Sequence, residues 1–293
     1  MKPAPFDYFA PTTIEEALSH LAEHGYDAKV LAGGQSLVPM MNFRLVQPSI
    51  LVDLNKIQDL AYIRADENGG VRIGAMTRHH QVEIDSLVAQ RMPLLHESMP
   101  HIGYPQIRNR GTLGGSLSHA DAAAELVAVT VALNGRFRVR NQDGERWIPA
   151  EDFFVGLFTT VLEPRDLLVE VELPPMPDHS GWSLMEVARR RHDFALVGVA
   201  AVVSLDDDGR CDRARMVFLS AGDGPVVAGR SADLLQGQAP GGEAIRAAAE
   251  MAAYEEIDPG SDIHASADFR RRLANVLARR ALDQAFERAA SGE

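Results

Sequence analysis

Two glycine-bearing stretches constrain this chain more than any other feature of its sequence. The first, residues 32–37, follows the apolar pair Val30-Leu31, and the second, residues 111–116, precedes an apolar run that predicts a helix over residues 120–133. Each contains a Gly-Gly pair, whose missing Cβ atoms let main-chain N–H groups come close to a ligand, and a neighbouring hydroxyl. Unpaired N–H groups at a helix N-terminus also favour an anion. Because both stretches adjoin regular structure, together they predict a clamp around a diphosphate.

The spacing of these glycines does not by itself identify the ligand. A Gly-Gly pair is often only a turn. Neither stretch has the Gly-Lys-Ser/Thr ending of a P-loop or the spaced glycines of the dinucleotide fingerprint. From the residues alone, two phosphate-binding loops for an unidentified ligand and two ordinary surface turns are both possible readings.

Composition narrows the class of protein. A chain of 293 residues with 46% hydrophobic and 24% charged residues can form two or three globular units. No apolar run reaches the roughly 18 residues of a membrane span, and the start of the chain lacks the apolar core of a secretory signal, so we expect a cytoplasmic protein. A net charge of −12 disfavours nucleic acid and anionic membranes as partners.

The cysteines, histidines and serines of the sequence argue against disulfide, metal and nucleophilic sites. Cys211 is the single cysteine of the sequence, so neither a disulfide framework nor a self-contained iron–sulfur cluster is possible. Among the histidines, His79, His80, His96, His101 and His119 form no i, i+4 pair of metal ligands with a glutamate between them, so no metal site is expected. The chain has no Gly-x-Ser-x-Gly motif, which argues against a nucleophilic serine.

The first half of the chain predicts strands alternating with helices. Thr13 and Glu16 form a capping-box pattern that begins a helix over residues 14–24, and Gly25 ends it. Thr77 is expected to cap a helix that runs to Ile84. The remaining elements expected here are strands at 28–31, 50–54, 71–75, 131–140, 145–148 and 167–173, and helices at 93–99 and from about Asp121. This alternation indicates an α/β unit at residues 1–60 and a second α/β unit, with a hairpin-rich end, at 61–177.

The second half begins at a proline-rich linker. Three prolines between Pro174 and Pro177 oppose both helix and central strand, so we place a domain boundary there, with a first domain at residues 1–177 and a second at 178–293. Strands are expected at 182–189, 195–205 and 213–221, and helices at 243–254 and 267–288. The last helix should bury the apolar residues Phe269, Leu273, Val276, Leu277 and Phe286. The predicted fold class is α+β, with an α/β-containing first part.

Three runs resemble the FAD-binding medium subunit of molybdenum hydroxylases, a family that includes the carbon monoxide dehydrogenase medium chain and the flavin domain of xanthine dehydrogenase. They are residues 29–41 (KVLAGGQSLVPMM), 106–116 (QIRNRGTLGGS) and 186–195 (EVARRRHDFA), in the family's order. The resemblance spans almost the whole chain. It implies a two-part PCMH-type FAD-binding domain, similar to that of the vanillyl-alcohol oxidases. A carbon monoxide dehydrogenase flavoprotein-type C-terminal domain would follow, with a three-stranded antiparallel sheet and helices.

The resemblance also implies which residues contact FAD. The diphosphate contacts would be Ala32, Gly33, Gly34, Gln35, Ser36 and Leu37 from the first stretch and Thr112, Gly114, Gly115 and Ser116 from the second. Near the flavin and its hydroxyls it implies Ile102, Asp121, Glu125, Leu168 and Phe194. An alternative interpretation is that Ile102, Leu168 and Phe194 are ordinary buried core residues. Asp121 and Glu125, four apart on one predicted helix face, are equal candidates, and Asp121 alone could also serve a helix N-terminus.

One residue departs from the family pattern. Some relatives carry a lysine where Glu186 stands, and a carboxylate cannot donate a hydrogen bond to a flavin oxygen as an ammonium can. Arg189 and Arg190 are the candidates to compensate.

The function implied is electron transfer within a larger assembly. A large subunit would oxidise substrate at molybdopterin, and a small subunit with [2Fe–2S] clusters would pass electrons to FAD on this chain, which would not be active alone. The assembly implied is a heterotrimer, often doubled to (αβγ)2. The acceptor (quinone, NAD or oxygen) and the substrate (carbon monoxide, a purine, an aldehyde or an N-heterocycle) stay open. The alternatives are a stand-alone flavin oxidase and a non-catalytic nucleotide-binding scaffold.

Overall fold

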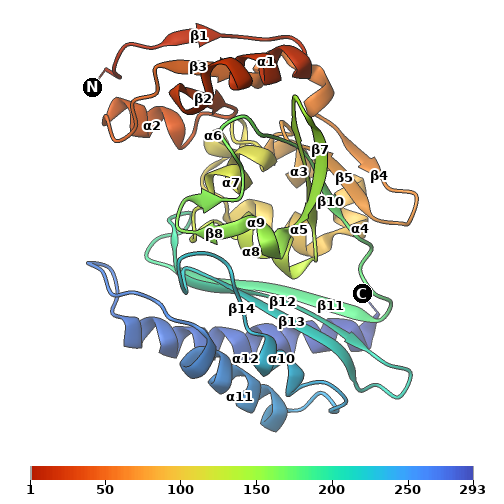
Figure 1. Cartoon of the computed structure of the whole chain (residues 1–293). Helices are drawn as coiled ribbons and strands as arrows, with labels where there is room; N and C mark the ends of the chain where they lie inside the picture. Colours follow the sequence, from red (N-terminus) through yellow and green to blue (C-terminus); the bar gives the residue numbers. More distant parts are fainter. Residues whose placement is uncertain (1, 293) are drawn as a thin grey trace.

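Three layers organise residues 2–292, the part of the chain that this computed structural model describes (Figure 1). The N-terminal layer is a parallel sheet with strand order β1-β3-β2, and helices α1 and α2 accompany it. Its elements are β1 (Asp7–Phe9), α1 (Ile14–His24), η1 (Gly25–Asp27), β2 (Ala28–Leu31), α2 (Leu37–Asn42), β3 (Ile50–Asp53), η2 (Leu54–Lys56) and η3 (Gln58–Leu60). This parallel arrangement agrees with the α/β unit predicted for the start of the chain.

Helix α1 begins and ends where its sequence signals predict. The Thr13 hydroxyl accepts a hydrogen bond from the Glu16 N–H at 3.2 Å, and Gly25 ends the helix with φ at 48°. The Glu16 carboxylate, however, accepts from the Thr12 N–H at 2.8 Å and not from Thr13, so the capping box is displaced by one residue. Leu18 and Leu21 pack into a small core beneath the sheet, and the helix thereby fixes the position of β2 and of the first glycine stretch that follows it.

The middle layer is a five-stranded sheet with order β4-β5-β10-β6-β7, in which every pairing is antiparallel. The α/β reading of this second unit was therefore wrong. The strands are β4 (Ile63–Ala65), β5 (Val71–Gly74), β6 (Arg136–Asn141), β7 (Gly144–Pro149) and β10 (Leu167–Leu173), and the short pair β8 (Phe154–Gly156) and β9 (Thr159–Thr160) lies beside them. The helices are α3 (His79–Ile84), α4 (Ser86–Arg91), α5 (Pro93–Ser98), η4 (Met99–His101), α6 (Pro105–Arg108), α7 (Leu113–His119), α8 (Glu125–Ala132) and α9 (Ala150–Phe153).

Two predicted helix boundaries in this layer were wrong. Thr77 does not cap α3, because its hydroxyl donates to the Tyr62 carbonyl at 2.9 Å, and Arg78 is the N-cap residue instead. The run over residues 120–133 is not one helix. The second glycine stretch itself opens α7, Ala120 then adopts a left-handed conformation with φ at 52°, and α8 begins only at Glu125.

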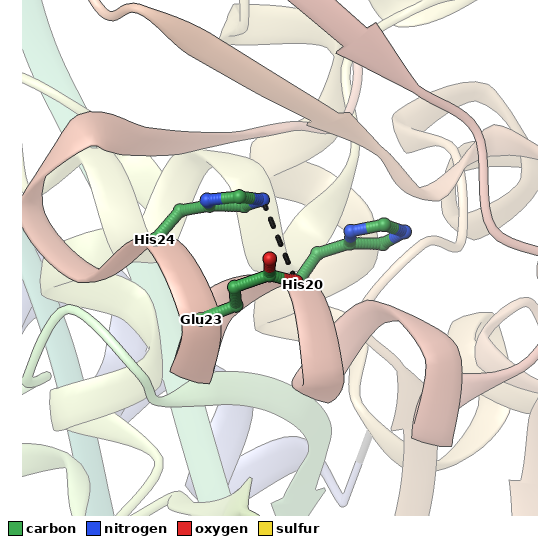
Figure 2. A group of neighbouring side chains, drawn as sticks. All are labelled: His20, Glu23 and His24. Atoms are coloured by element: carbon green, nitrogen blue, oxygen red, sulfur yellow. Dashed lines mark ion pairs between the residues drawn. The ribbon is translucent and has the colours of Figure 1, made fainter.

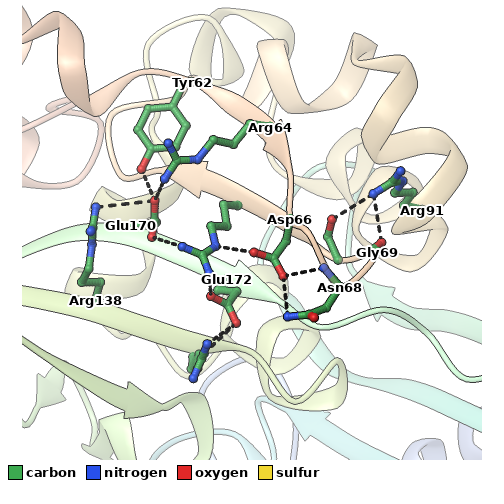
Figure 3. Close-up of polar contacts among 12 residues, drawn as sticks. Tyr62, Arg64, Asp66, Asn68, Gly69, Arg91, Arg138, Glu170 and Glu172 are labelled. Carbon is green, nitrogen blue, oxygen red and sulfur yellow. Dashed lines mark hydrogen bonds and ion pairs between the residues drawn. The ribbon is translucent and has the colours of Figure 1, made fainter.

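A network of ion pairs covers one face of the middle sheet (Figure 3). The carboxylate of Glu170 on β10 is fully buried and accepts hydrogen bonds from Tyr62 and from Arg64 at 2.8 Å. Arg138 lies 3.5 Å away on the neighbouring strand. A buried carboxylate is stable only when it is paired in this way. Burial, followed by the hydrogen bond to Glu170, raises the pKa of Tyr62 to about 12. These contacts tie β4, β6 and β10 into one rigid wall.

The C-terminal layer is an antiparallel sheet with order β11-β12-β13-β14, covered on one face by two long helices (Figure 1). Its elements are β11 (Ser180–Ala188), β12 (Ala195–Leu205), β13 (Cys211–Leu219), β14 (Val226–Val227), α10 (Gly229–Asp233), α11 (Gly242–Met251), the π-helix η5 (Ala252–Glu256) and α12 (Ala267–Ser291). The three predicted strands are present, and the two-residue β14 adds a fourth. The other face of this sheet packs against the middle layer, since Trp182 and Leu219 belong to the same apolar cluster as Leu126. The domain boundary placed at residue 177 stays a prediction.

Helix α12 buries only part of the predicted face: Leu277 and Phe286 are buried and Leu273 packs against the core, but the other two predicted residues are exposed. Phe269 and Val276 are 46% and 42% exposed, whereas a row of alanines, together with Leu277, Leu282 and Phe286, faces the sheet. The helix lies so close that a Cβ on Gly181 would stand 2.6 Å from the Ala289 nitrogen. Small side chains therefore set the helix–sheet distance. None of the helices within residues 2–292 is long and apolar enough to span a membrane.

Candidate cofactor site

The two glycine stretches meet in space. A Cβ on Gly33 would stand 2.8 Å from the Gly111 Cα and closer still to the Arg110 carbonyl oxygen, so alanine cannot be accommodated there without moving one of the main chains. On the other side of the contact, a Cβ on Gly115 would lie 3.4 Å from the Ala32 Cβ. The loop after β2 and the first turn of α7 thus form the two walls of one junction.

The first stretch offers a row of free hydrogen-bond donors. Within residues 2–292, the main-chain N–H groups of Gly33, Gly34, Gln35 and Ser36 have no hydrogen-bond partner; the first donor after them is Val38, which bonds to the Gly34 carbonyl at 3.1 Å. Gly34 has φ at 74°, a conformation that glycine adopts without strain. Successive N–H groups that include a left-handed residue form a concave anion-binding nest. This geometry suits a phosphate.

Most N–H groups of the second stretch already have partners; within residues 2–292, that of Thr112 alone among residues 111–116 has none. The Gly114 N–H donates to the Ala75 carbonyl at 2.8 Å, the Gly115 N–H to the Thr112 hydroxyl at 3.1 Å, and the Ser116 N–H to the Thr112 carbonyl at 3.0 Å. The glycine at 114 is needed for another reason, because its Cβ would stand 2.5 Å from the Ala75 Cβ. The second stretch is therefore a closely packed wall, and not a second set of free N–H donors as the sequence predicted.

A side-chain bridge joins the two stretches. The Asn55 side-chain amide donates to the Ala32 carbonyl at 2.9 Å, and its oxygen accepts from the Arg78 guanidinium. The same guanidinium donates to the Arg110 carbonyl, directly before the second stretch. Sequence reasoning missed both residues, and no local signal in the chain marks either of them, because the bridge exists only once β3 and α3 come together.

We expect Asn55→Ala to loosen this junction. The change leaves the Ala32 carbonyl and the Arg78 guanidinium without their shared partner, and an unsatisfied partly buried polar group costs about 1–3 kcal/mol. The free energy of unfolding in urea should fall by that amount, and FAD affinity should fall about tenfold. Gln142→Ala in the exposed β6–β7 turn is the matched control. Equal stability and FAD affinity of the two variants would contradict the role of the bridge.

A buried histidine, His79, packs against the second glycine stretch and bonds to its main chain. His79 is 4% exposed, and its Nε2 lies 2.9 Å from the Thr112 carbonyl. Burial lowers the pKa of His79 to about 4, so the ring is neutral at pH 7 and can donate this bond. A Cβ on Gly111 would stand 2.8 Å from its Nδ1, which explains the glycine there.

The two acids predicted to contact FAD, Asp121 and Glu125, follow α7 in the chain, and only Glu125 is buried. Asp121 is half-buried in a turn where its carboxylate accepts from the Ala123 N–H at 2.9 Å, so it does not share a helix face with Glu125 as predicted, nor does it cap a helix. Glu125 opens α8 and is 8% exposed. Burial, followed by the negative charge of Glu186, raises the pKa of Glu125 to about 8. At pH 7 this carboxyl group keeps its proton and can donate a hydrogen bond.

Glu186 has a partner that the sequence did not reveal. Its carboxylate lies 3.0 Å from the Nδ1 of His101. That hydrogen bond raises the pKa of His101. The two arginines expected to compensate at this position turn elsewhere: Arg189 contacts His264 at 3.0 Å, and Arg190 pairs with Asp193 at 2.9 Å.

Comparison with known families identifies the family of this chain and its cofactor. The model of the FAD binding domain in molybdopterin dehydrogenase matches residues 4–176, and the model of the CO dehydrogenase flavoprotein C-terminal domain matches residues 182–285. The chain belongs to the FAD-binding subunits of the molybdenum hydroxylases. It is an oxidoreductase subunit with FAD as its cofactor, which confirms the resemblance and rules out the scaffold reading.

Relatives of this FAD-binding subunit cover nearly its full length. The 6-hydroxypseudooxynicotine dehydrogenase complex subunit alpha of Paenarthrobacter nicotinovorans is 42% identical over 99% of this chain and 97% of its own. The carbon monoxide dehydrogenase medium chain of Hydrogenophaga pseudoflava is 36% identical over 99% and 100%. A solved carbon monoxide dehydrogenase from Hydrogenophaga pseudoflava superposes with a TM-score of 0.95, at 35% identity and over 98% and 99% of the two chains. Quinoline 2-oxidoreductase from Pseudomonas putida 86 gives 0.93, at 38% identity and over 99% of each chain.

The remaining residues predicted to contact FAD differ in their exposure. Leu168 is 4% exposed within the apolar cluster of the middle layer, and Ile102 packs against the same cluster while partly exposed. Phe194 precedes β12 and is 72% exposed, so the reading of Phe194 as a buried core residue was wrong. An exposed aromatic ring beside the EVARRRHDFA run is free to contact a ligand or a partner.

Among the described residues, one group has the residue types of a metal site, on α1 (Figure 2). His20, Glu23 and His24 bring their ligand atoms within 4.8 Å of one another, and sequence reasoning overlooked this i, i+4 histidine pair. The His20 ring stacks on Phe9 at 4.2 Å between centroids, and the His24 ring stacks on Phe9 at 5.7 Å. Packing on one aromatic ring accounts for this arrangement without an ion.

Proposed function

We propose that this subunit holds FAD between its two glycine stretches, takes electrons from [2Fe–2S] clusters of a partner subunit and passes them to an external acceptor. The observation that carries the binding part is the row of four free N–H groups, Gly33 to Ser36, set against the closely packed wall at Gly115. The family match supports FAD as the molecule whose diphosphate occupies this nest.

The proposed FAD contacts combine this geometry with what the family resemblance implies. The first stretch, Ala32 to Leu37, would bind the diphosphate through its N–H groups and the exposed Ser36 hydroxyl, and Thr112, Gly114, Gly115 and Ser116 would form the opposing wall. Protonated Glu125 can donate to a ligand oxygen or nitrogen, and the carboxyl oxygens of Asp121 can accept from ligand hydroxyl or N–H groups. We place the isoalloxazine ring beside these two acids, where Ile102, Leu168 and Phe194 supply apolar side chains.

The electrons must come from outside this chain. Bound FAD can collect electrons one at a time and release them in pairs, whereas this chain has no other redox group of its own. Its single cysteine, Cys211, is 1% exposed, and burial raises the pKa of its thiol to about 11, so it cannot help ligate a cluster. A partner subunit with iron–sulfur clusters fits this need.

We propose that the complex is a heterotrimer, doubled to (αβγ)2, with its substrate site on the large subunit. The relatives named above belong to a dehydrogenase complex and to a carbon monoxide dehydrogenase, and a further one, 37% identical, is the caffeine dehydrogenase subunit beta of Pseudomonas sp. CBB1. Subunits this similar serve unlike substrates, which supports a role for this chain in electron transfer and not in substrate recognition.

Reconstitution tests the proposal against a stand-alone flavin oxidase. The purified chain should be yellow and should not be reduced by carbon monoxide, purines, aldehydes or N-heterocycles. Its FAD should be reduced once partner molybdopterin and iron–sulfur subunits are added. The measurement is flavin absorbance under anaerobic conditions. Reduction of the isolated chain by any of these substrates would favour the stand-alone oxidase.

A further inference from the structure

Three titratable side chains from three separate elements lie close together: Glu186 and His101 are in direct contact, and Glu125 is near enough to feel the charges of both. Glu125 comes from the first turn of α8, Glu186 from β11, and His101 from the end of η4. The His101 Nδ1 lies 3.0 Å from one oxygen of Glu186. We call these three residues the acid–histidine cluster. It lies between the middle layer and the C-terminal sheet.

The cluster has an unused acceptor. The second oxygen of Glu186, Oε2, is buried and has no hydrogen-bond partner within residues 2–292, although the side chain is 8% exposed. Buried polar atoms without partners are rare in folded proteins, because each one loses its hydration. This oxygen therefore indicates a donor that joins the site: a proton, a water or a ligand group.

The surrounding charges favour holding a proton in the cluster. Glu125 is surrounded by the negative charges of Glu186 and Asp121 and by His101, and burial raises its pKa to about 8. His101 faces Glu186, Glu125 and the cation of Arg191, and its pKa is raised. Two buried carboxylates cannot both ionise cheaply, so near neutral pH the cluster holds at least one proton and has room for another.

The cluster also connects the buried interior to solvent. The His101 side chain is 37% exposed, that of Glu186 is 8% exposed, and Glu125 is 8% exposed as a residue. Glu125 lies six residues beyond the end of α7, the helix that the second glycine stretch opens. Ile102, one of the apolar contacts proposed for the ring, follows His101 directly.

We propose that Glu125, Glu186 and His101 form a proton-storing site beside the flavin ring, which takes up one proton from solvent when bound FAD gains two electrons. This inference rests on the proposed function. The balance is two electrons from the partner's iron–sulfur clusters, one proton to the flavin and one proton to the cluster, entering through exposed His101. The added negative charge on the flavin raises the proton affinity of the cluster, and the stored proton in turn stabilises the reduced flavin.

The midpoint potential of FAD in the full-length chain, measured spectroelectrochemically between pH 7 and 9, tests the proposal. Each proton taken up with an electron pair contributes about 30 mV per pH unit to the slope. The slope for Glu125→Gln/Glu186→Gln should be shallower than that of the parent by up to that amount. Glu250→Gln, which removes an exposed carboxylate on α11, should keep the parent slope.

Equal slopes for the parent and the double variant would overturn the proposal while leaving FAD binding intact. A parent chain that binds no FAD would overturn the proposed function and this inference together. Circular dichroism and flavin absorbance verify that the double variant is folded and loaded. If it is not, His101→Gln, at the exposed edge of the cluster, is measured instead and should also flatten the slope; a slope equal to that of the parent would overturn the proposal.

Discussion

Replacing Gly33 by alanine is expected to lower FAD affinity by about 10- to 100-fold. The new Cβ would stand 2.8 Å from the Gly111 Cα and closer still to the Arg110 carbonyl, and both are main-chain atoms that cannot rotate away. Overpacking of this kind costs about 1–3 kcal/mol, and here the strain can be relieved only by separating the two glycine stretches. Separation would disorganise the nest of free N–H groups, so the loss should appear mainly in binding. Quenching of flavin fluorescence on titration with FAD measures it.

Gly229→Ala is the control for this change. Gly229 begins α10, and a Cβ there would meet nothing within 4 Å, so FAD affinity should stay at the parent value. Circular dichroism of the FAD-free proteins separates a lost site from a lost fold. If Gly33→Ala folds and binds FAD as tightly as Gly229→Ala, the two stretches do not act together.

The second large effect is on stability as a function of pH. The pKa of Glu125 rises from 4.5 to about 8 on folding, because burial disfavours its charged form. Below pH 4.5 both states hold the proton. Between pH 4.5 and 8 the unfolded chain loses it and the folded chain keeps it, so the free energy of unfolding falls as pH rises. The contribution of Glu125 to this loss is on the order of 5 kcal/mol by pH 8, and it is constant above that pH.

Glu125→Gln should remove this dependence, because the amide has the shape of the protonated acid and no proton to lose. The FAD-free variant should equal the parent in urea denaturation near pH 4.5 and exceed it by several kcal/mol at pH 8 to 9. Glu250→Gln on exposed α11 should follow the parent across the whole range. If the parent and Glu125→Gln show the same pH profile, Glu125 is ionised in the folded chain and does not act as a donor.

Local signals predicted the parts of the fold that depend on neighbours in sequence. Thr13 and Gly25 gave the bounds of α1, and the apolar runs over residues 28–31 and 195–205 matched β2 and β12 residue for residue. These predictions succeeded because a cap residue or a β-branched run determines the conformation of residues only a few positions away in the sequence.

Tertiary contacts explain where prediction failed. Glycines are weak helix formers, so residues 113–116 did not predict a helix, yet their missing side chains let α7 pack against Ala75 and Ala32. Ala120 takes a left-handed conformation that alanine rarely adopts. This ends α7, and the helix predicted from residue 120 begins only at Glu125. The bridge through Asn55 and Arg78 and the pairing of His101 with Glu186 join residues 23 and 85 positions apart, which no local pattern encodes.

The position of the diphosphate in a crystal structure of the FAD-loaded chain tests the central claim most directly. Phosphate oxygens should lie within hydrogen-bond distance of the N–H groups between Gly33 and Ser36, with Gly115 and Ser116 on the opposite side. A diphosphate that touches only one stretch, or that is bound away from their junction, would contradict it.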